Sequence, residues 1–328
     1  MIDDSPDGSV PGGDATYIAL CGGVGGSKLA AGLQALLGRR LTVVVNVGDD
    51  FDHLGLRICP DIDTVLYRLS GLNDEQRGWG RADESWQFMR ALGQFSEETW
   101  FQLGDLDVAL HVVRTHRQAA GYALAEITMD MADRLGIDAR VVPATDDAVR
   151  TKVVCQEGVL DFQRYFVERR CEPPIERLVF EGAADARPTP AAEAAFAADS
   201  LAGIVICPSN PYLSIDPILA IPRLRALLAE RRVPAVAVSP IIDGKAVKGP
   251  TAKIMRELNV ASTPHSIALH YEGLIDGLMI DTMDASRQAE DCGVPVCSAA
   301  TLMTSAEDQV ALAGAAIDFM RRIAGTMV

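Results

Sequence analysis

Basic residues are scarce in this sequence. It holds 30 Lys and Arg against 45 Asp and Glu, which gives a formal net charge of −15. A surface of that sign repels phosphate backbones and anionic lipid headgroups, so broad binding to nucleic acid or to a membrane is disfavoured. The composition still leaves room for a local basic pocket that receives a small anionic molecule.

Long apolar runs are absent as well. No run reaches the length of a membrane span. The first residues, MIDDSPDGSVPGGD, contain neither a basic segment nor an apolar segment, so they do not resemble a signal peptide. We therefore expect a flexible tail over residues 1–15 and a cytoplasmic protein.

The cysteines show no pairing pattern. There are seven of them, an odd number, and they lie far apart without a CxxC motif. This pattern argues against a disulfide framework and against a structural zinc site. The cysteines are expected to be free and buried.

The sequence does contain apolar strands that alternate with helices. TYIAL and LTVVVNV lie near the N-terminus, and LAGIVIC and PAVAVS follow much later. Continuous apolar runs are typical of parallel strands that are buried on both faces. The predicted fold class is α/β, with a Rossmann-like, doubly wound, mostly parallel sheet and an inserted, mainly helical α+β subdomain.

The change of pattern along the chain sets the predicted domains. We assign residues 16–71 and 201–328 to the Rossmann-like core and residues 72–200 to the inserted subdomain. The inserted range holds the three tryptophans and a long helical pattern near residues 121–135. The segment RPTPAAEAAF is expected to be a loop that leads back into the core.

A glycine-rich stretch, CGGVGGSKLAAGL, follows the first strand. We expect a phosphate-binding loop and then a helix from about Lys28. A Walker A motif is excluded because Ser27 precedes Lys28 instead of following a Gly-Lys pair. Only half of GxGxxG is present, since Gly23 and Gly25 fit and Lys28 takes the place of the third glycine. An NAD(P)-dependent oxidoreductase with a variant Rossmann fingerprint stays open as an alternative, with Asp49 near the ribose.

Carboxylates crowd the segment after the second strand. In NVGDDFDHLGLRICPDIDT the acidic residues are Asp49, Asp50, Asp52, Asp61 and Asp63. Carboxylates this close repel one another unless a cation lies among them, and oxygen ligands suit Mg²⁺. The alternative is that some of them only shape a turn or begin a helix.

Polar loops follow the later strands too. CPSNPYLSI supplies Ser209 and Asn210, and SPIIDGKAVKGP supplies Lys245, Lys248 and Gly249. Ligands of open α/β sheets bind beyond the carboxyl ends of the strands. These loops are therefore expected to meet the glycine-rich stretch in one site.

The inserted range has its own polar segment, LGDLDVALHVVRTHR. On a helix, His111 and Arg114 would share a face because they are three residues apart. The Arg114 guanidinium would suit a phosphate or a carboxylate. An ordinary charged surface helix is the alternative.

In order and spacing, these segments resemble the CofD/FbiA family, the 2-phospho-L-lactate transferases of coenzyme F-420 biosynthesis. The segments that carry the resemblance are GGVGGSKLAAGL, VVNVGDD, GLRICPDIDTVLY, GWGRADESW, LGDLDVALHVVRT, PATDD, FQRYFVERR, CPSNPYLSI and SPIIDGKAVKGP. They run from about residue 17 to the C-terminal helix, which is nearly the whole chain.

The resemblance implies an Mg²⁺-dependent enzyme that joins two small molecules. It implies that the ribityl hydroxyl of the deazaflavin Fo attacks the distal phosphorus of a guanosine diphosphate-linked donor, and that GMP leaves. The transferred group is phospholactyl, phosphoenolpyruvyl or phosphoglyceryl, and the sequence leaves this choice open. A homodimer is implied as well. A nucleotide-binding regulatory protein without catalysis is a third possibility, disfavoured by the carboxylates.

Site residues are carried over by the same resemblance. Donor or phosphate contacts are assigned to Gly23, Gly25, Gly26, Ser27, Lys28, Ser209, Asn210, Pro211, Lys245, Lys248 and Gly249. Contacts to Fo are assigned to Asp63, Trp79, Trp86, Asp105, His111 and Arg114, and the inserted subdomain would cover this acceptor. Catalytic roles are assigned to Asp49, Asp50, Asp61 and Asp63. The metal ligands would be Asp49, Asp50 and Asp61.

Overall fold

The computed structural model describes residues 13–246, 249–287 and 292–326. A seven-stranded sheet forms its centre, and every neighbouring pair in it is parallel. In spatial order the strands are β14 (Val296–Ala299), β13 (Gly277–Asp281), β10 (Ala235–Val238), β9 (Leu201–Ile206), β1 (Thr16–Cys21), β2 (Leu41–Val45) and β5 (Arg140–Pro143). The chain runs from β1 outward through β2 to β5, and then from β9 outward on the other side. This is the doubly wound Rossmann order, which confirms the predicted fold class.

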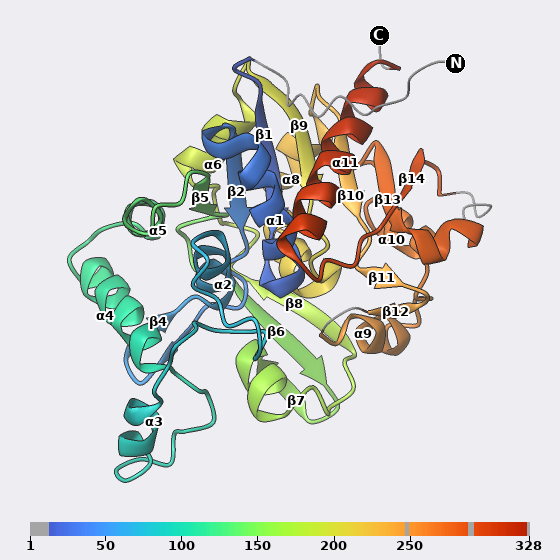
Figure 1. The fold of residues 1–328 in the computed structure, drawn as a ribbon. Helices are drawn as coiled ribbons and strands as arrows, with labels where there is room; N and C mark the ends of the chain where they lie inside the picture. Colours follow the sequence, from blue (N-terminus) through green and yellow to red (C-terminus); the bar gives the residue numbers. More distant parts are fainter. Residues whose placement is uncertain (1–12, 247–248, 288–291, 327–328) are drawn as a thin grey trace.

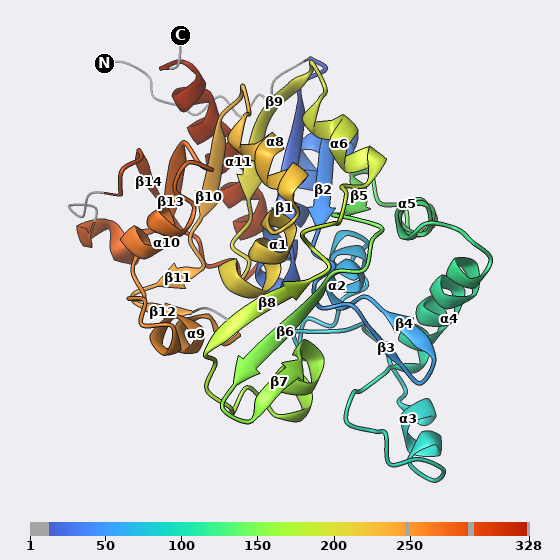
Figure 2. The same cartoon turned by 180° about the vertical axis from the view of Figure 1, so that it is seen from behind.

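Helices cover both faces of the sheet. One face carries α1 (Gly23–Leu37) and α11 (Ala306–Ala324), which lie against each other (Figure 1). The other carries α6 (Pro190–Phe196) and α8 (Pro222–Ala229) (Figure 2). A Cβ on Gly32 would lie 2.0 Å from the Gln309 carbonyl oxygen, so only glycine allows α1 and α11 to approach this closely.

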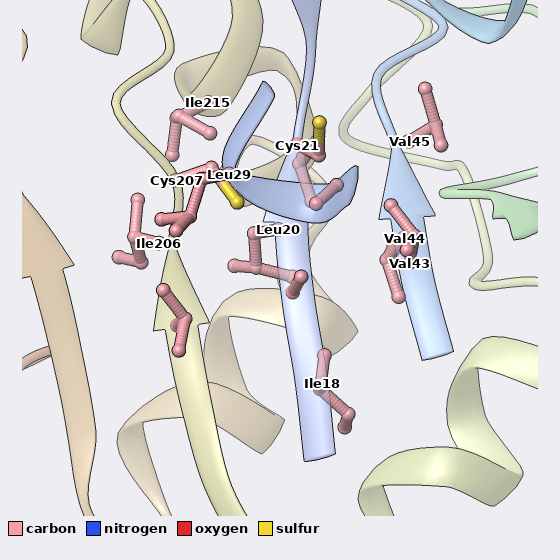
Figure 3. Packing of buried hydrophobic residues seen from close by; sticks show 14 of the residues in the cluster. Ile18, Leu20, Cys21, Leu29, Val43, Val44, Val45, Ile206, Cys207 and Ile215 are labelled. Carbon is pink, nitrogen blue, oxygen red and sulfur yellow. The ribbon is translucent and has the colours of Figure 1, made fainter. Parts of the chain in front are cut away.

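The core lies between these layers. Ile18 and Leu20 of β1 pack beside Val43 of β2 and Ile206 of β9 (Figure 3), and all four are almost fully buried. Burial on both faces explains why these strands are apolar throughout instead of alternating. Cys21, Cys59, Cys155 and Cys207 are buried, as expected, whereas Cys171, Cys292 and Cys297 are half-buried.

A second group of elements lies beyond the carboxyl edge of the sheet, toward which the strand arrows point in Figure 1. It includes the hairpin β3 (Phe51–His53) and β4 (Leu56–Ile58), and a small sheet of β7 (Gly158–Asp161), β6 (Arg150–Cys155) and β8 (Arg177–Glu181). Its helices are α2 (Pro60–Leu69), α3 (Gln87–Leu92), α4 (Asp105–Ala119) and α9 (Thr251–Glu257). The helix α5 (Leu124–Arg134) instead packs against β5 of the central sheet. A separate small core of Ile58, Met89 and Leu103 holds α3 to the hairpin.

Short elements complete the described chain. They are η1 (Gly38–Arg40), η2 (Arg164–Glu168), η3 (Pro211–Ile215), α7 (Asp216–Leu219), β11 (Ile241–Ile242), β12 (Lys245–Ala246), α10 (Pro264–His270) and η4 (Thr282–Arg287). Within the described part, no helix is long and apolar enough to cross a membrane.

Two local predictions were wrong. The helix expected from about Lys28 begins at Gly23, so the glycine-rich stretch is the first turn of α1 and not a loop. The segment expected as a loop contains α6, because Thr189 accepts a hydrogen bond from the Ala192 N–H and Pro190 occupies the first turn. The range 72–200 also contains β5, a strand of the central sheet, and the division into domains stays a prediction.

Candidate functional site

A cavity of about 690 Å³ lies where the chain reverses its winding, between the carboxyl ends of β1 and β9. Gly22–Gly25 and Pro208–Asn210 form one wall, and Asp49 follows β2. Residues of the second group of elements form the opposite wall. Four predicted strand-end segments therefore contribute to one cavity, through Gly25, Asp49, Asn210 and Gly249.

The N-terminus of α1 opens into the cavity. The Gly22 N–H donates to Ser209 Oγ at 3.1 Å, and the Ser209 hydroxyl donates back to the Gly22 carbonyl at 2.8 Å. The first turn of α1 has no acidic side chain and no side-chain cap, and Val24 and Gly25 line the cavity. The first N–H groups of a helix lack intrahelical partners and carry positive partial charge, so this end favours an anion.

Close approach explains the glycines of this turn. A Cβ on Gly25 would lie 2.6 Å from the Pro208 carbonyl oxygen, and one on Gly26 would lie 2.1 Å from Ser209 Oγ. Gly26 and Ser27 are buried outside the cavity lining, and the Ser27 hydroxyl donates to the Val24 carbonyl at 3.0 Å. Gly26 thus allows α1 to approach the loop after β9, and neither Gly26 nor Ser27 lines the cavity.

Two buried aspartates converge beside this turn. Asn46 Nδ2 lies 2.9 Å from Asp61 Oδ2 and 3.3 Å from Asp49 Oδ1. The Gly23 N–H donates to Asp61 Oδ1 at 2.7 Å. Both carboxylates line the cavity, and neither takes part in an ion pair among the described residues.

The surroundings of these two carboxylates disfavour their negative charge. Burial, followed by the charges of Asp61 and Asp50, raises the pKa of Asp49. Burial raises the pKa of Asp61 to about 6, although hydrogen bonds from Asn46 and Gly23 oppose the change. A cation between Asp49 and Asp61 would relieve the penalty of burying both charges.

Asp50 faces a different space. It lines a second cavity of about 300 Å³ on the other side of the loop, together with His53 and Thr151. Among the described residues its Oδ1 has no hydrogen-bond partner, and burial raises its pKa to about 7. The structure therefore brings Asp49 and Asp61 to the main cavity without Asp50.

A polar network forms the wall opposite the glycine turn. Asp63 accepts hydrogen bonds from two nitrogens of Arg114, which is fully buried. His111 Nε2 lies 3.2 Å from Asp107 Oδ2, and the Tyr67 hydroxyl donates to Asp107. Burial opposes the charge of Asp107, but the nearby His111 ring and the hydrogen bond from Tyr67 lower its pKa.

The same network contains a candidate metal-binding group. Ligand atoms of Asp63, Asp107 and His111 lie within 4.8 Å of one another. The positive charge of Arg114 already compensates the charge of Asp63. Burial lowers the pKa of Arg114, but Asp63 raises it above its usual range. The group is thus balanced by residues of the chain itself.

An apolar wall borders the polar network. It consists of Trp79, Phe101, Phe162, Phe166 and Val167. The rings of Phe162 and Phe166 stack at a centroid distance of 5.3 Å, and Phe166 is 39% exposed. Such a wall suits the face of a flat aromatic molecule.

The remaining predicted residues divide between the cavity and its supports. Gly23, Lys28, Ser209, Asn210, Gly249, Trp79, His111 and Asp63 line the cavity. Arg114 supports Asp63 from behind, and Pro211 is buried at the start of η3. Lys245 is exposed on β12 away from the cavity lining, and Lys248 lies outside the described residues.

Two acceptor assignments do not reach the cavity lining. Trp86 packs at 6.1 Å against the Trp79 ring, and Asp105 accepts hydrogen bonds from the N–H groups of Gln87 and Phe88. Asp105 thereby fixes the start of α3. These positions support the wall without forming it.

Sequence reasoning missed several residues of the cavity. The missed lining residues are Tyr67, Arg77, Phe101, Asp107, Phe162 and Phe166. Asn46, which is fully buried and contacts Asp49 and Asp61, was missed as well. Asn46 directly follows the second strand, which is a signal that could have identified it. Phe162 and Phe166 lie in FQRYFVERR, a segment that carries the family resemblance, but they were given no role because only the tertiary fold brings this segment to the cavity.

The chain is similar to proteins of one family. The family model described as 2-phospho-L-lactate transferase CofD matches residues 18–298. A "Phosphoenolpyruvate transferase" of Streptomyces griseus is 38% identical over 316 residues, covering 93% of this chain and 98% of that protein. A "Phosphoenolpyruvate transferase" of Mycobacterium tuberculosis is 40% identical over 311 residues, covering 87% of this chain and 92% of that protein.

The fold is also similar to a solved structure. A protein of the UPF0052 family from Bacillus halodurans aligns with a TM-score of 0.58 at 18% identity, covering 92% of this chain and 98% of that one. At this identity the likeness concerns the fold alone.

Proposed function

Because the chain belongs to the CofD family of 2-phospho-L-lactate transferases, we propose that it moves a phosphate-linked three-carbon group onto the deazaflavin Fo. The donor in this proposal is a guanosine diphosphate ester, and GMP is the leaving group. The ribityl hydroxyl of Fo attacks the distal phosphorus, the bond from that phosphorus to the GMP oxygen breaks, and a phosphodiester forms. The names of the relatives favour phosphoenolpyruvyl as the transferred group.

One juxtaposition carries the proposal. The first turn of α1, through Val24 and Gly25, and the carboxylates of Asp49 and Asp61 face the same cavity as the aromatic wall. A helix N-terminus suits a diphosphate, and the aromatic wall suits a flat tricyclic ring. Phosphoryl transfer requires charge neutralisation and in-line positioning, which these groups supply.

Mg²⁺ fits Asp49 and Asp61 better than it fits the group of Asp63, Asp107 and His111. The first pair is buried without an ion pair among the described residues, and each pKa is raised. The second group already contains the Arg114 guanidinium, which would repel a metal ion. When bound, Mg²⁺ would neutralise charge on the diphosphate.

The polar network would serve the acceptor. Asp63 faces the cavity with its oxygens fixed by Arg114, so it can accept a hydrogen bond from the attacking hydroxyl in one orientation. The hydroxyl proton passes to a carboxylate of the set Asp49, Asp61 and Asp63. Phe162 and Phe166 would hold the ring of Fo.

Mass spectrometry of a reaction mixture tests the function. Purified protein is given Mg²⁺, Fo and the guanosine diphosphate esters of lactate, enolpyruvate and glycerate, each in its own reaction. We expect one phosphodiester of Fo and an equal amount of GMP over many turnovers. Consumption of NADH or NADPH with no new phosphodiester would contradict the proposal and favour the oxidoreductase alternative.

A further inference from the structure

Positive side chains are rare in the main cavity. Among the described lining residues, Lys28 and Arg77 are the two with a Lys or Arg side chain, against four aspartates. Lys28 extends from the second turn of α1, and its Nζ donates to the Met303 carbonyl at 2.6 Å. Arg77 comes from the loop between α2 and α3, on the opposite wall.

The loop that carries Arg77 has a defined shape. The Arg77 N–H donates to Asp74 Oδ1 at 2.8 Å, and its guanidinium lies 3.5 Å from Asp74 Oδ2. Backbone hydrogen bonds from Asp74 to Gly80 and from Gly78 to Asp74 close the turn. The guanidinium carbon is 4.4 Å from the centre of the Trp86 ring and 5.3 Å from that of Trp79.

The loop also lies near Lys28. Asn73, then Arg68 and Lys28, lower the pKa of Glu75, and Arg68 donates a hydrogen bond to this carboxylate. Glu75 is two residues before Arg77 in the same turn. Lys28 from α1 and Arg77 from this loop thus line the same cavity.

The proposed donor presents two kinds of anion. Its diphosphate can be bound by backbone N–H groups at the start of α1, which need no cationic side chain. Its three-carbon group ends in a carboxylate, and a guanidinium matches a carboxylate with two parallel hydrogen bonds. An arginine fixed by stacking on tryptophans loses less freedom on binding than a flexible one.

We propose that Arg77, together with Lys28 of the same cavity lining, forms the subsite for the carboxylate of the transferred three-carbon group. This inference rests on the proposed function. In this proposal, Arg77 is the residue that distinguishes donors with a carboxylate from donors without one. The wall of Trp79 and Trp86 holds the guanidinium toward the cavity.

Calorimetric titration without Fo tests the subsite, since no turnover occurs. Two donors are compared in the presence of Mg²⁺: the guanosine diphosphate ester of lactate and that of 2-propanol, in which a methyl group replaces the carboxylate. We expect the wild-type chain to bind the lactyl ester about 10- to 100-fold more tightly. Arg77→Gln should lose this preference and bind the 2-propyl ester within about twofold of wild type.

Two further variants control for charge and for folding. Arg77→Lys keeps the charge without the planar fork and should keep only part of the preference. Arg81→Gln removes an arginine of the same loop that does not line the cavity. This variant should keep the full preference for the lactyl ester. The 2-propyl ester reports within each variant whether the diphosphate site is intact.

The outcomes separate the two proposals. Equal affinity of wild type for both esters, or an equal loss for both in Arg77→Gln, overturns the carboxylate subsite while leaving the transfer reaction standing. Failure of wild type to bind either ester overturns the proposed function itself. Retention of the full preference in Arg77→Gln places the carboxylate elsewhere.

Discussion

The Gly23 N–H donates to Asp61 Oδ1 at 2.7 Å, which joins the first turn of α1 to the first turn of α2. A Cβ on the preceding Gly22 would lie 2.3 Å from Asp61 Oδ2, so glycine is required for this contact. The anion-binding end of one helix and a carboxylate of the next are therefore fixed in one unit. A diphosphate with a bound cation would therefore contact the end of α1 and the Asp61 carboxylate at once.

The carboxylate of Asp61 should be essential for transfer. We expect Asp61→Asn to lower kcat by more than about 100-fold, because the side chain keeps its size and loses the charge that faces the cavity. Steady-state formation of GMP measures the effect. Asp52→Asn is the matched control, since Asp52 is 73% exposed and pairs with Arg57 on the surface. Full activity of Asp61→Asn would reject its assigned role.

Mg²⁺ should stabilise the fold through Asp49 and Asp61. A ligand at 100 times its Kd adds about 2.7 kcal/mol to the free energy of unfolding. Thermal melting with and without Mg²⁺ should show this gain in wild type and in Asp107→Asn, but not in Asp61→Asn. If Asp107→Asn alone loses the gain, the metal lies instead in the group of Asp63, Asp107 and His111.

Stability in the absence of metal should fall as the pH rises. Burial raises the pKa of Asp50 from 3.8 to about 7, so the folded state binds more protons than the unfolded state between these values. The contribution is complete below about pH 4 and is lost as the pH rises through about 7, by up to about 4 kcal/mol. Urea unfolding at pH 5 to 8 should show a steeper decline for wild type than for Asp50→Asn. Parallel declines would contradict this prediction.

The sequence predicted the doubly wound sheet because its strands are apolar throughout. It singled out Asp49 and Asp61 because they belong to a crowded set of carboxylates after the second strand, in a segment that carries the family resemblance. It could not separate Asp50 from Asp49, although Asp49 lines both cavities and Asp50 lines only the second one. It also placed Gly26 in a phosphate loop, whereas the start of α1 at Gly23 buries that residue. Both differences depend on packing between distant segments.

The aromatic wall should contribute to the binding of the acceptor Fo and not to the binding of the donor. Phe166 lines the cavity, stacks on Phe162 and is partly exposed, so Phe166→Ala removes ring contact area without opening the core. We expect the KM for Fo to rise about 10-fold and the affinity for the donor to stay unchanged. Phe95→Ala, at an 88% exposed position, is the control. A raised KM for the donor would count against the assignment.

A methyl group at Gly26 should destabilise the protein. The new Cβ would lie 2.1 Å from Ser209 Oγ, and this hydroxyl cannot turn away without losing its two hydrogen bonds with Gly22. We expect Gly26→Ala to lower the free energy of unfolding by about 1–3 kcal/mol, measured in urea. Gly314→Ala, within α11, is the matched control. Its new Cβ would meet only Leu36 Cδ1 of α1, at 3.9 Å. At position 314, alanine should raise the free energy of unfolding by up to about 1 kcal/mol, because it lowers the backbone entropy of the unfolded chain. Equal effects of the two substitutions would show that contact with Ser209 does not determine the choice of glycine at the start of α1.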